Sequence, residues 1–284
     1  MALGRTAVGI DGLHVAVTGA AGGIGAATVA ALVAAGARVS AGDLAADAAG
    51  AVATSAAADG PGAAAGLPLD VTDTASYRGF LSAAHDRFGP LDVLVGNAGV
   101  MWVGPFAAEP EAAIRRQLEV NLHGVIRGAQ LAVPGMVGRG RGHLITVASV
   151  ASRIAPAGEA TYSATKHAVL GYCTALRAEL HRTGVHVSLI MPTVVETELA
   201  AGTTHGRVRR LRPDDVAAAV VRTIRRPRPE VYVPGRVGAL VRLRDALPTR
   251  AREAMVRAMV PDQIAATDPA TRTEYHKRAL GVDE

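Results

Sequence analysis

The sequence predicts an α/β fold, with a single doubly wound parallel sheet of about seven strands and a C-terminal helical extension. Short apolar runs alternate with longer helical stretches along most of the 284 residues, and this order is typical of a parallel sheet. A composition of 49% hydrophobic and 19% charged residues is sufficient for one sizeable core. A glycine-rich turn joins the first apolar run to the first helical stretch.

Each element follows from a local pattern of apolar residues and turn signals. Buried strands are predicted near residues 13–18, 37–42, 65–69, 91–95, 143–148, 185–190 and 230–233. Helices are predicted between them, near residues 23–35, 44–58, 73–88, 109–137, 161–183 and 213–226. Asp73 is expected to cap the third helix, and Gly184 is expected to end the helix that begins near Thr161.

The turn after the first strand contains three spaced glycines, Gly19, Gly23 and Gly25. Such glycines allow a tight turn and let the backbone approach a pyrophosphate closely. The N-terminus of the following helix supplies unpaired N–H groups and the positive end of the helix dipole. The pattern predicts a dinucleotide-binding turn, with a glycine-rich loop that binds nothing as the alternative.

Tyr162 and Lys166 form the second informative pair. The chain holds only two lysines, Lys166 and Lys277, against 28 arginines. Residues four apart share one face of a helix, so the ammonium of Lys166 can lie beside the phenol of Tyr162. A nearby cation would lower the pKa of the phenol toward the working pH, as a general acid/base requires. The alternative is an accidental pair on a helix surface.

Together the two motifs resemble the single-domain branch of the short-chain dehydrogenase/reductase family, over roughly residues 10–233. The resemblance implies a Rossmann-type sheet. Thr193 is a departure, because the family usually has Gly at that place, and it puts in question the loop geometry next to the nicotinamide. Further matches follow in the expected order, namely Asn97-Ala98-Gly99, Asn121, Ser149 and Pro192.

The resemblance also assigns catalytic roles. Tyr162 would protonate a carbonyl oxygen during reduction or take the hydroxyl proton during oxidation. Ser149 would hydrogen-bond the same oxygen, and Lys166 would bind the nicotinamide ribose and tune Tyr162. Asn121 would hold a helix distortion and a water that links Lys166 to solvent. The implied reaction transfers a hydride between NAD(H) and a secondary alcohol or ketone.

The charge of Asp43 at the end of the second predicted strand bears on the choice between NAD(H) and NADP(H). The carboxylate of Asp43 can accept hydrogen bonds from ribose hydroxyls and would repel a 2′-phosphate. The family often has Arg or Lys at the places of Gly22 and Leu44 when it uses NADP, so NAD(H) is predicted and NADP(H) is the alternative. The residues expected to bind the cofactor are Gly19, Gly22, Gly23, Ile24, Asp43, Leu44, Asp70, Val71, Asn97, Ala98, Gly99, Tyr162, Lys166, Pro192, Val195 and Thr197.

The substrate pocket is expected to be mostly apolar. Its expected lining is Ser149, Met101, Trp102, Ala151 and Tyr162, which favours a lipophilic alcohol or ketone over a sugar. Arg153 or Glu159 would either anchor a polar group or lie on the surface. Residues 193–212 are predicted to form a substrate loop within one dehydrogenase domain, residues 1–233.

Residues 234–284 form a predicted basic helical extension packed on the same domain. Residues 207–260 carry 14 Arg or Lys and 5 Asp or Glu, against 13 and 15 in residues 1–206. Amphipathic helices are predicted at 237–247 and 250–260, and a last helix begins at Pro269 and ends at Gly281. The extension could cover the pocket, contact another subunit, lie solvated or touch an anionic membrane. Nucleic acid is not an expected partner, because no aromatic residues are interleaved with the basic ones.

Several function classes are disfavoured by what the sequence lacks. One cysteine, Cys173, excludes an internal disulfide framework, and the histidines show no metal-ligand spacing, so no metal is expected. Residues 1–10 do not read as a secretion signal, so a cytoplasmic protein is expected, with membrane association only through the extension. The family resemblance implies that the helices at 109–137 and 161–183 form the contacts of a homodimer or homotetramer. The rival functions are an NADP-linked carbonyl or acyl reductase and a non-enzymatic dinucleotide sensor.

Overall fold

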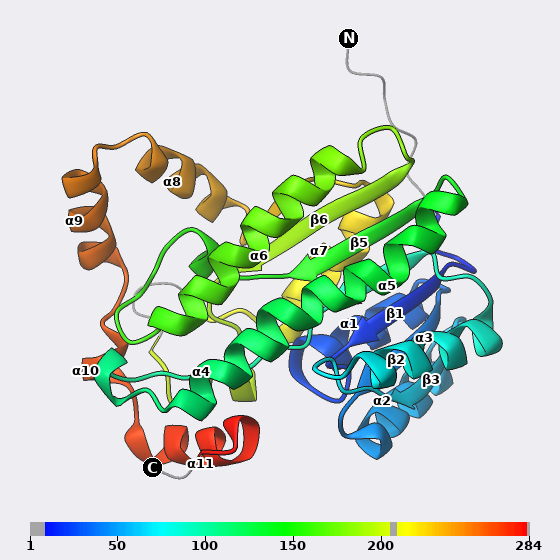
Figure 1. The fold of residues 1–284 in the computed structure, drawn as a ribbon, viewed down its shortest axis with the longest axis horizontal. Coiled ribbons are helices and arrows are strands. Elements are labelled where there is room, and N and C mark those ends of the chain that lie inside the picture. The colour runs from blue at the N-terminus through cyan, green and yellow to red at the C-terminus, as the bar shows by residue number, and fades with distance from the viewer. Residues whose placement is uncertain (1–8, 205–208, 283–284) are drawn as a thin grey trace.

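A computed structural model describes residues 9–204 and 209–282. Its centre is a sheet of seven parallel strands in the order β3-β2-β1-β4-β5-β6-β7, which confirms the predicted fold class (Figure 1). The strands are β1 (His14–Thr18), β2 (Arg38–Asp43), β3 (Ala63–Pro68), β4 (Val93–Gly96), β5 (Gly142–Val147), β6 (Val185–Pro192) and β7 (Glu230–Val233).

Helices cover both faces of the sheet. One face carries α1 (Gly23–Ala34), α2 (Ala46–Asp59) and α7 (Pro213–Arg225), which lie behind the sheet in Figure 1. The other face carries α3 (Thr74–Phe88), α5 (Gly124–Gly138) and α6 (Ala160–Glu179). Asp73 caps α3 as predicted, since its carboxylate accepts hydrogen bonds from the N–H groups of Ala75 and Ser76.

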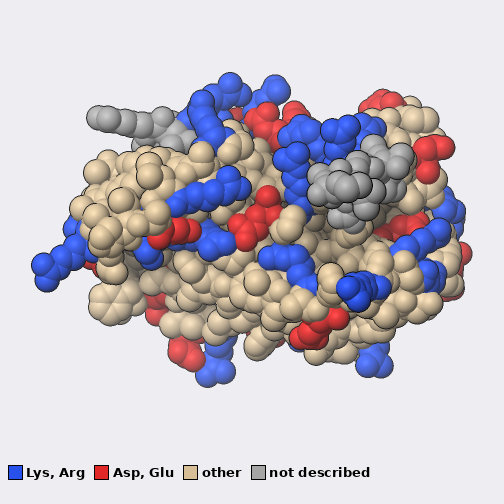
Figure 2. Space-filling view, turned by 90° about the horizontal axis from the view of Figure 1, so that it is seen from above, with Lys and Arg blue, Asp and Glu red and all other residues tan. Residues whose placement is uncertain are grey.

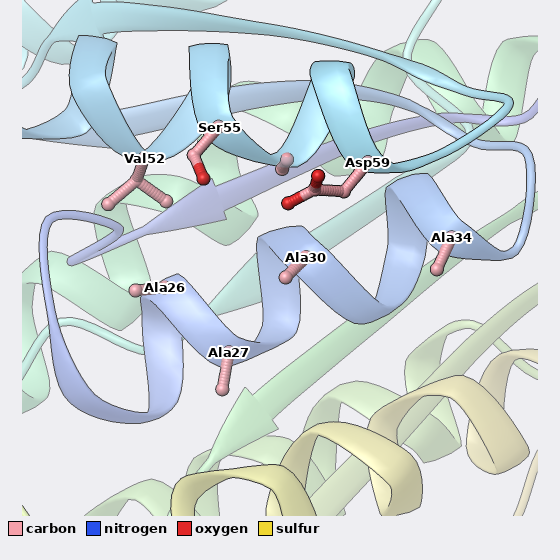
Figure 3. A pocket seen from close by; sticks show the side chains of 8 residues that line it. Ala26, Ala27, Ala30, Ala34, Val52, Ser55 and Asp59 are labelled. Atoms are coloured by element: carbon pink, nitrogen blue, oxygen red, sulfur yellow. The ribbon is translucent and has the colours of Figure 1, made fainter.

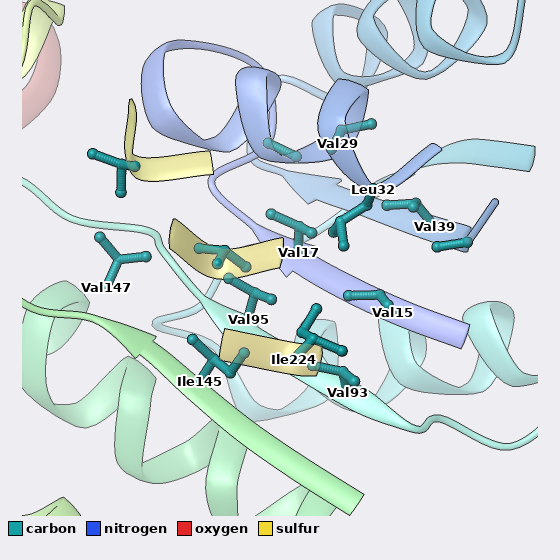
Figure 4. Close-up of a cluster of buried hydrophobic side chains, with 14 of the residues drawn as sticks. Val15, Val17, Val29, Leu32, Val39, Val93, Val95, Ile145, Val147 and Ile224 are labelled. Atoms are coloured by element: carbon teal, nitrogen blue, oxygen red, sulfur yellow. The ribbon is translucent and has the colours of Figure 1, made fainter. Parts of the chain in front are cut away.

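The core follows from alternation along the central strands. Val15 and Val17 of β1 face α1 and α7, whereas Ala16 between them faces the other helix layer. Figure 4 shows these valines with Leu32 of α1 and Ile224 of α7 in one buried cluster. Parallel strands covered on both faces are apolar on both sides, which is why the strands read as continuous apolar runs.

The helix predicted at 109–137 is interrupted. It consists of α4 (Glu111–Leu118), a π-helical turn (Glu119–His123) and α5. The side chain of Asn121 lies inside this turn, where its carboxamide bonds to the backbone of Val100. A π-helical turn is rare and is often found at functional sites, so the distortion points to the region around Asn121.

The helix that contains Tyr162 ends earlier than predicted. α6 stops at Glu179, and Arg182 already has a left-handed φ of 65°. Gly184 therefore does not end the helix. Its φ is 82°, and a Cβ there would lie 1.9 Å from the carbonyl oxygen of Gly140, so glycine is required by a close approach of two loops.

The C-terminal extension contains α8 (Arg236–Asp245), α9 (Thr249–Met259), α10 (Gln263–Ala266) and α11 (Pro269–Leu280). These helices run along one end of the molecule, from α8, which contacts β7, through α9 to α11 beside α4 (Figure 1). Pro269 begins α11 and Gly281, with a φ of 67°, ends it as predicted. Among residues 9–204 and 209–282, no helix has both the length and the apolar character that a membrane span needs.

The surface shows two features away from the strand ends. A shallow groove of about 330 Å³ lies between α1 and α2, and alanines predominate among its lining residues, with Ser55 and Asp59 at its rim (Figure 3). Figure 2 shows one face on which Lys and Arg gather in several groups with Asp and Glu between them. The excess of basic residues in the sequence therefore does not form one unbroken basic surface on that face.

Candidate active site

A cavity of about 660 Å³ opens at the carboxyl ends of β1, β4, β5 and β6, where doubly wound sheets bind their ligands. One side is the glycine-rich turn, and the other is formed by the loop after β6 and the C-terminal extension. The predicted site residues in its lining are Gly19, Gly22, Gly23, Ile24, Asp43, Asn97, Ala98, Gly99, Met101, Ser149, Ala151, Tyr162, Lys166, Pro192, Val195 and Thr197.

Five predicted site residues lie outside the lining. Trp102, expected in the pocket wall, is buried in a separate cluster with Ala113 and Leu280, and its ring stacks on His276. Apolar packing against α11 therefore replaces its expected contact with substrate. The others are the exposed Leu44, the buried Asn121, Val71, and Asp70, whose carboxylate bonds to Thr72.

The glycine-rich turn fits a bound pyrophosphate. Gly19 has a φ of 66°, and a Cβ there would lie 2.8 Å from the Cα of Ala98. No side chain caps the N-terminus of α1 at Gly22, and its first turn holds no acidic residue. A Cβ at Gly22 would meet nothing within 4 Å, so the N–H groups of this helix end face open space and suit an anionic group.

Asp43 is held rigidly at the end of β2. Its carboxylate accepts hydrogen bonds from the N–H groups of Ala21, at 2.9 Å, and Ala45, at 3.0 Å. One bond fixes the carboxylate to the glycine-rich turn, and the other fixes it to the turn that leads into α2. A negative charge therefore stands at a defined place beside the turn, as a ribose-binding carboxylate requires.

Asn97 joins the end of β4 to the same turn. Its side-chain amide donates to the carbonyl oxygens of Thr18 and Gly19, each at 3.0 Å. The hydroxyl of Thr18 accepts from the N–H groups of Asn97 and Ala98 in return. This reciprocal network fixes the glycine-rich turn against the central strand.

Asn121 acts from behind the cavity wall. Its amide donates to the carbonyl of Val100 at 2.8 Å and to the hydroxyl of Thr165 at 3.2 Å, and its oxygen accepts from the N–H of Val100. These bonds link the segment after β4 to α6, next to Lys166. These bonds give Asn121 a positioning role. The water that Asn121 is predicted to hold stays a prediction.

Tyr162 and Ser149 meet inside the cavity. The hydroxyl of Ser149 accepts from the N–H of Ala151 and is a side-chain hydrogen-bond partner of the Tyr162 phenol. Burial raises the pKa of Tyr162, the charge of Glu159 raises it further, and the bond with Ser149 opposes them. The pKa of Tyr162 is therefore raised, not lowered as the sequence predicts, and Lys166 is not among the groups that shift it.

Lys166 lies on the same face of α6. Its Nζ is 5.5 Å from the centroid of the Tyr162 ring and 3.5 Å from the carbonyl oxygen of Val147, to which it donates. Burial lowers its pKa to about 8. The arrangement can hold a hydroxyl or carbonyl oxygen between Tyr162 and Ser149 and exchange a proton with it.

Sequence reasoning missed the contribution of the C-terminal extension to this site. Several of its side chains line the cavity: Val237 and Leu240 of α8, Met255, Val256 and Met259 of α9, and Tyr275 and Ala279 of α11. The apolar stripe of the amphipathic helices was the available signal. The lining agrees with the pocket cover that the sequence offered as one alternative, and the subunit and membrane contacts stay predictions. Part of the predicted substrate loop, residues 205–208, lies outside the described residues.

Arg153 and Glu159, the two candidate polar anchors, have different surroundings. Arg153 pairs with Glu230 of β7 at 2.9 Å and does not line the cavity. Glu159 lines it and is 8% exposed. Within the described part of the chain, no group of three or more His, Cys, Asp or Glu side chains could hold a metal ion.

The buried carboxyl of Glu159 makes stability depend on pH. Burial raises its pKa from 4.5 to about 7, although the charge of Arg272 acts against the rise. The folded protein then binds more protons than the unfolded chain between these values, so stability falls as pH rises through them. We expect urea unfolding to show a loss of up to about 3 kcal/mol across this window, most of which Glu159→Gln removes. The same pH dependence in both proteins would contradict the assignment, and Glu179→Gln, an exposed site on α6, is the control.

Comparison with known proteins shows that this fold and its motifs belong to one protein family. The family described as short chain dehydrogenase matches residues 13–207. The chain belongs to this family. D-threitol dehydrogenase from Mycolicibacterium smegmatis is 36% identical over 223 residues, which cover 75% of this chain and 85% of that protein. 1-Deoxy-11-beta-hydroxypentalenate dehydrogenase from Streptomyces exfoliatus is 37% identical over 236 residues, covering 81% and 85%.

One relative shares only a small part of its length with this chain, whereas two solved structures are matched over almost their whole length. The chain spans 18% of glycine betaine reductase ATRR from Emericella nidulans, at 33% identity over 77% of its own length. A short-chain dehydrogenase/reductase from Burkholderia phymatum, solved with NAD, has a TM-score of 0.78 at 26% identity, covering 92% of this chain and 99% of that one. A metagenomic short-chain oxidoreductase solved with NADP has a TM-score of 0.70 at 31% identity, covering 79% and 98%.

Family membership places the chain among the short-chain dehydrogenases, and its relatives include proteins named as dehydrogenases and as reductases. Its structural neighbours are bound to NAD in one case and to NADP in another, so the family alone does not select the cofactor. The choice between them, and the substrate, depend on residues of this chain.

Proposed function

We propose that the protein transfers a hydride between NAD(H) and a lipophilic secondary alcohol or ketone. The observation that carries the proposal is the cluster of Tyr162, Ser149 and Lys166 in one cavity with the glycine-rich turn and Asp43. A sensor of dinucleotides would not need a phenol, a hydroxyl and a buried amine at one point.

Each residue of the cluster has a separate role in the proposed reaction. The hydroxyl of Ser149 and the phenol of Tyr162 hold the reacting oxygen, and the phenol gives a proton to it during reduction or takes one during oxidation. Lys166 binds the nicotinamide ribose, and Asn121 keeps the segment at Val100 in place beside it. The bound cofactor supplies or accepts the hydride.

A lipophilic substrate is supported by the walls of the cavity. Met101 and Ala151 lie on the side of the sheet, and the methionines and valines of α8 and α9 lie opposite. Methionine side chains adapt their shape to apolar ligands of different form. Two relatives with more than two thirds of their length covered are named as dehydrogenases, which supports oxidation of an alcohol.

The test of cofactor choice is steady-state turnover of secondary alcohols and ketones with NAD(H) and with NADP(H). We expect kcat/KM to be at least about tenfold higher with NAD(H), because the fixed carboxylate of Asp43 repels a 2′-phosphate. Asp43→Asn keeps the size of the side chain and removes the charge, so it should erase most of the preference. Asp47→Asn, at an exposed position in the first turn of α2, is the matched control. A wild-type protein that prefers NADP(H) would support the rival NADP-linked reductase.

A further inference from the structure

The substrate end of the cavity contains a carboxyl group that the hydride-transfer reaction does not use. Glu159 directly precedes α6, three residues before Tyr162. Glu159 lines the same cavity as Tyr162 and Ser149. The charge of Glu159 acts directly on the pKa of the Tyr162 phenol, as expected for two neighbouring side chains.

The carboxylate of Glu159 is buried without a hydrogen bond or ion pair to another residue of the described chain. Its residue is 8% exposed, and the space it reaches is the cavity. It does not cap α6, because no side-chain hydrogen bond is made at that helix end. A buried carboxyl group normally has a hydrogen-bond donor, so this one lacks the partner that its burial requires.

Arg272 is the cation whose charge acts on the pKa of Glu159, and its guanidinium has hydrogen-bond partners of its own. Its guanidinium donates to the carbonyl oxygens of Leu199, Ala201 and Met101 and lies over the ring of Tyr275. Its charge nevertheless reaches Glu159 and opposes the rise of the Glu159 pKa. The carboxylate and the guanidinium together leave little net charge at this end of the cavity.

We propose that Glu159 binds a second hydroxyl group of the substrate, placed on the carbon next to the one that reacts. The substrate class is then a lipophilic vicinal diol in oxidation, or an α-hydroxy ketone in reduction. A neutral donor suits the site better than an ammonium, because Arg272 would repel a cation. A substrate carboxylate would be repelled by Glu159 itself.

The position of Glu159 supports the vicinal arrangement. The reacting oxygen lies between Tyr162 and Ser149, and Glu159, the residue before the helix that carries Tyr162, lines the same cavity and its charge acts on the phenol. Oxygens on adjacent carbons are roughly 3 Å apart, so one can reach the phenol while the other donates to the carboxylate. The remaining walls are apolar and suit the hydrocarbon part of the molecule.

This inference rests on the proposed hydride transfer, and its test separates the two. The probes are cyclohexanol and trans-cyclohexane-1,2-diol, assayed with saturating NAD and, separately, NADP. We expect wild-type kcat/KM to be roughly 10- to 100-fold higher for the diol, the worth of one hydrogen bond to a charged group. Glu159→Leu should remove this ratio by lowering the diol value alone, and Glu159→Gln, which keeps an acceptor oxygen, should retain part of it.

A control variant on the same helix and a binding measurement that needs no turnover complete the test. Glu179→Leu, at an exposed position at the far end of α6, should leave both substrates unchanged. Thermal shifts of the cofactor-loaded protein measure binding of both probes without turnover. Selective stabilisation by the diol that Glu159→Leu abolishes, with no oxidation, would support the Glu159 site and contradict the hydride transfer. Oxidation of both probes with equal kcat/KM, or equal thermal shifts in the absence of turnover, would overturn the role of Glu159.

Discussion

Tyr162→Phe is expected to lower kcat by about 10³-fold while the protein still binds NAD(H), because the phenol is the group that exchanges a proton with the substrate. Phenylalanine keeps the buried ring and its contacts with Met101 and Ala151, so the fold should persist. The measurements are kcat with a turned-over alcohol and NADH binding by fluorescence titration.

The matched control is Tyr172→Phe, which removes a phenol from the same helix at a half-buried position outside the cavity. It should leave kcat within about threefold of wild type, the range of ordinary surface substitutions. A Tyr162→Phe protein that keeps more than about a tenth of wild-type kcat would show that another group moves the proton. A wild-type protein that binds NADH and turns over no alcohol or ketone would favour the sensor instead.

Much of the architecture could be predicted because its signals are local. The apolar runs that become β1, β4 and β5 are buried on both faces, so most of the residues in them are apolar. The glycine-rich turn is also local, since the positive φ of Gly19 and the close approach of Ala98 leave room only for glycine. The motif residues Ser149, Tyr162 and Lys166 could be placed together through the family resemblance, and the structure brings them into one cavity.

The parts that sequence reasoning missed depend on contacts between distant segments. Trp102 is apolar and next to the predicted pocket, but α11 returns some 170 residues later and buries it against Leu280 and His276. The surroundings of Glu159 likewise depend on the extension, since the charge of Arg272 acts on Glu159 and the N–H of Gln263 donates to the carbonyl oxygen of Ala157. Helical periodicity predicted these late helices correctly, but periodicity does not specify where a helix packs.

Arg272→Met is expected to loosen the substrate side of the site. Arg272 is 2% exposed, and its guanidinium donates to backbone carbonyls of the loop after β6, Leu199 and Ala201, and of the segment after β4, Met101. Methionine fills much of the volume but leaves these buried acceptors without their donor. We expect the free energy of unfolding to fall by roughly 2–4 kcal/mol, since each unsatisfied buried acceptor costs about 1–3 kcal/mol before local relaxation.

The same substitution should separate substrate binding from cofactor binding. The carbonyl oxygens that Arg272 holds belong to Met101, Leu199 and Ala201, whereas Asn97 and Asp43 hold the glycine-rich turn. KM for an alcohol should therefore rise about tenfold or more, while the Kd of NADH stays within about threefold. Arg278→Met is the control, because Arg278 lies on the same helix and makes an exposed ion pair with Glu198, worth about 0–1 kcal/mol. A loss of stability with an unchanged KM would mean that α11 holds the fold together without shaping the substrate site.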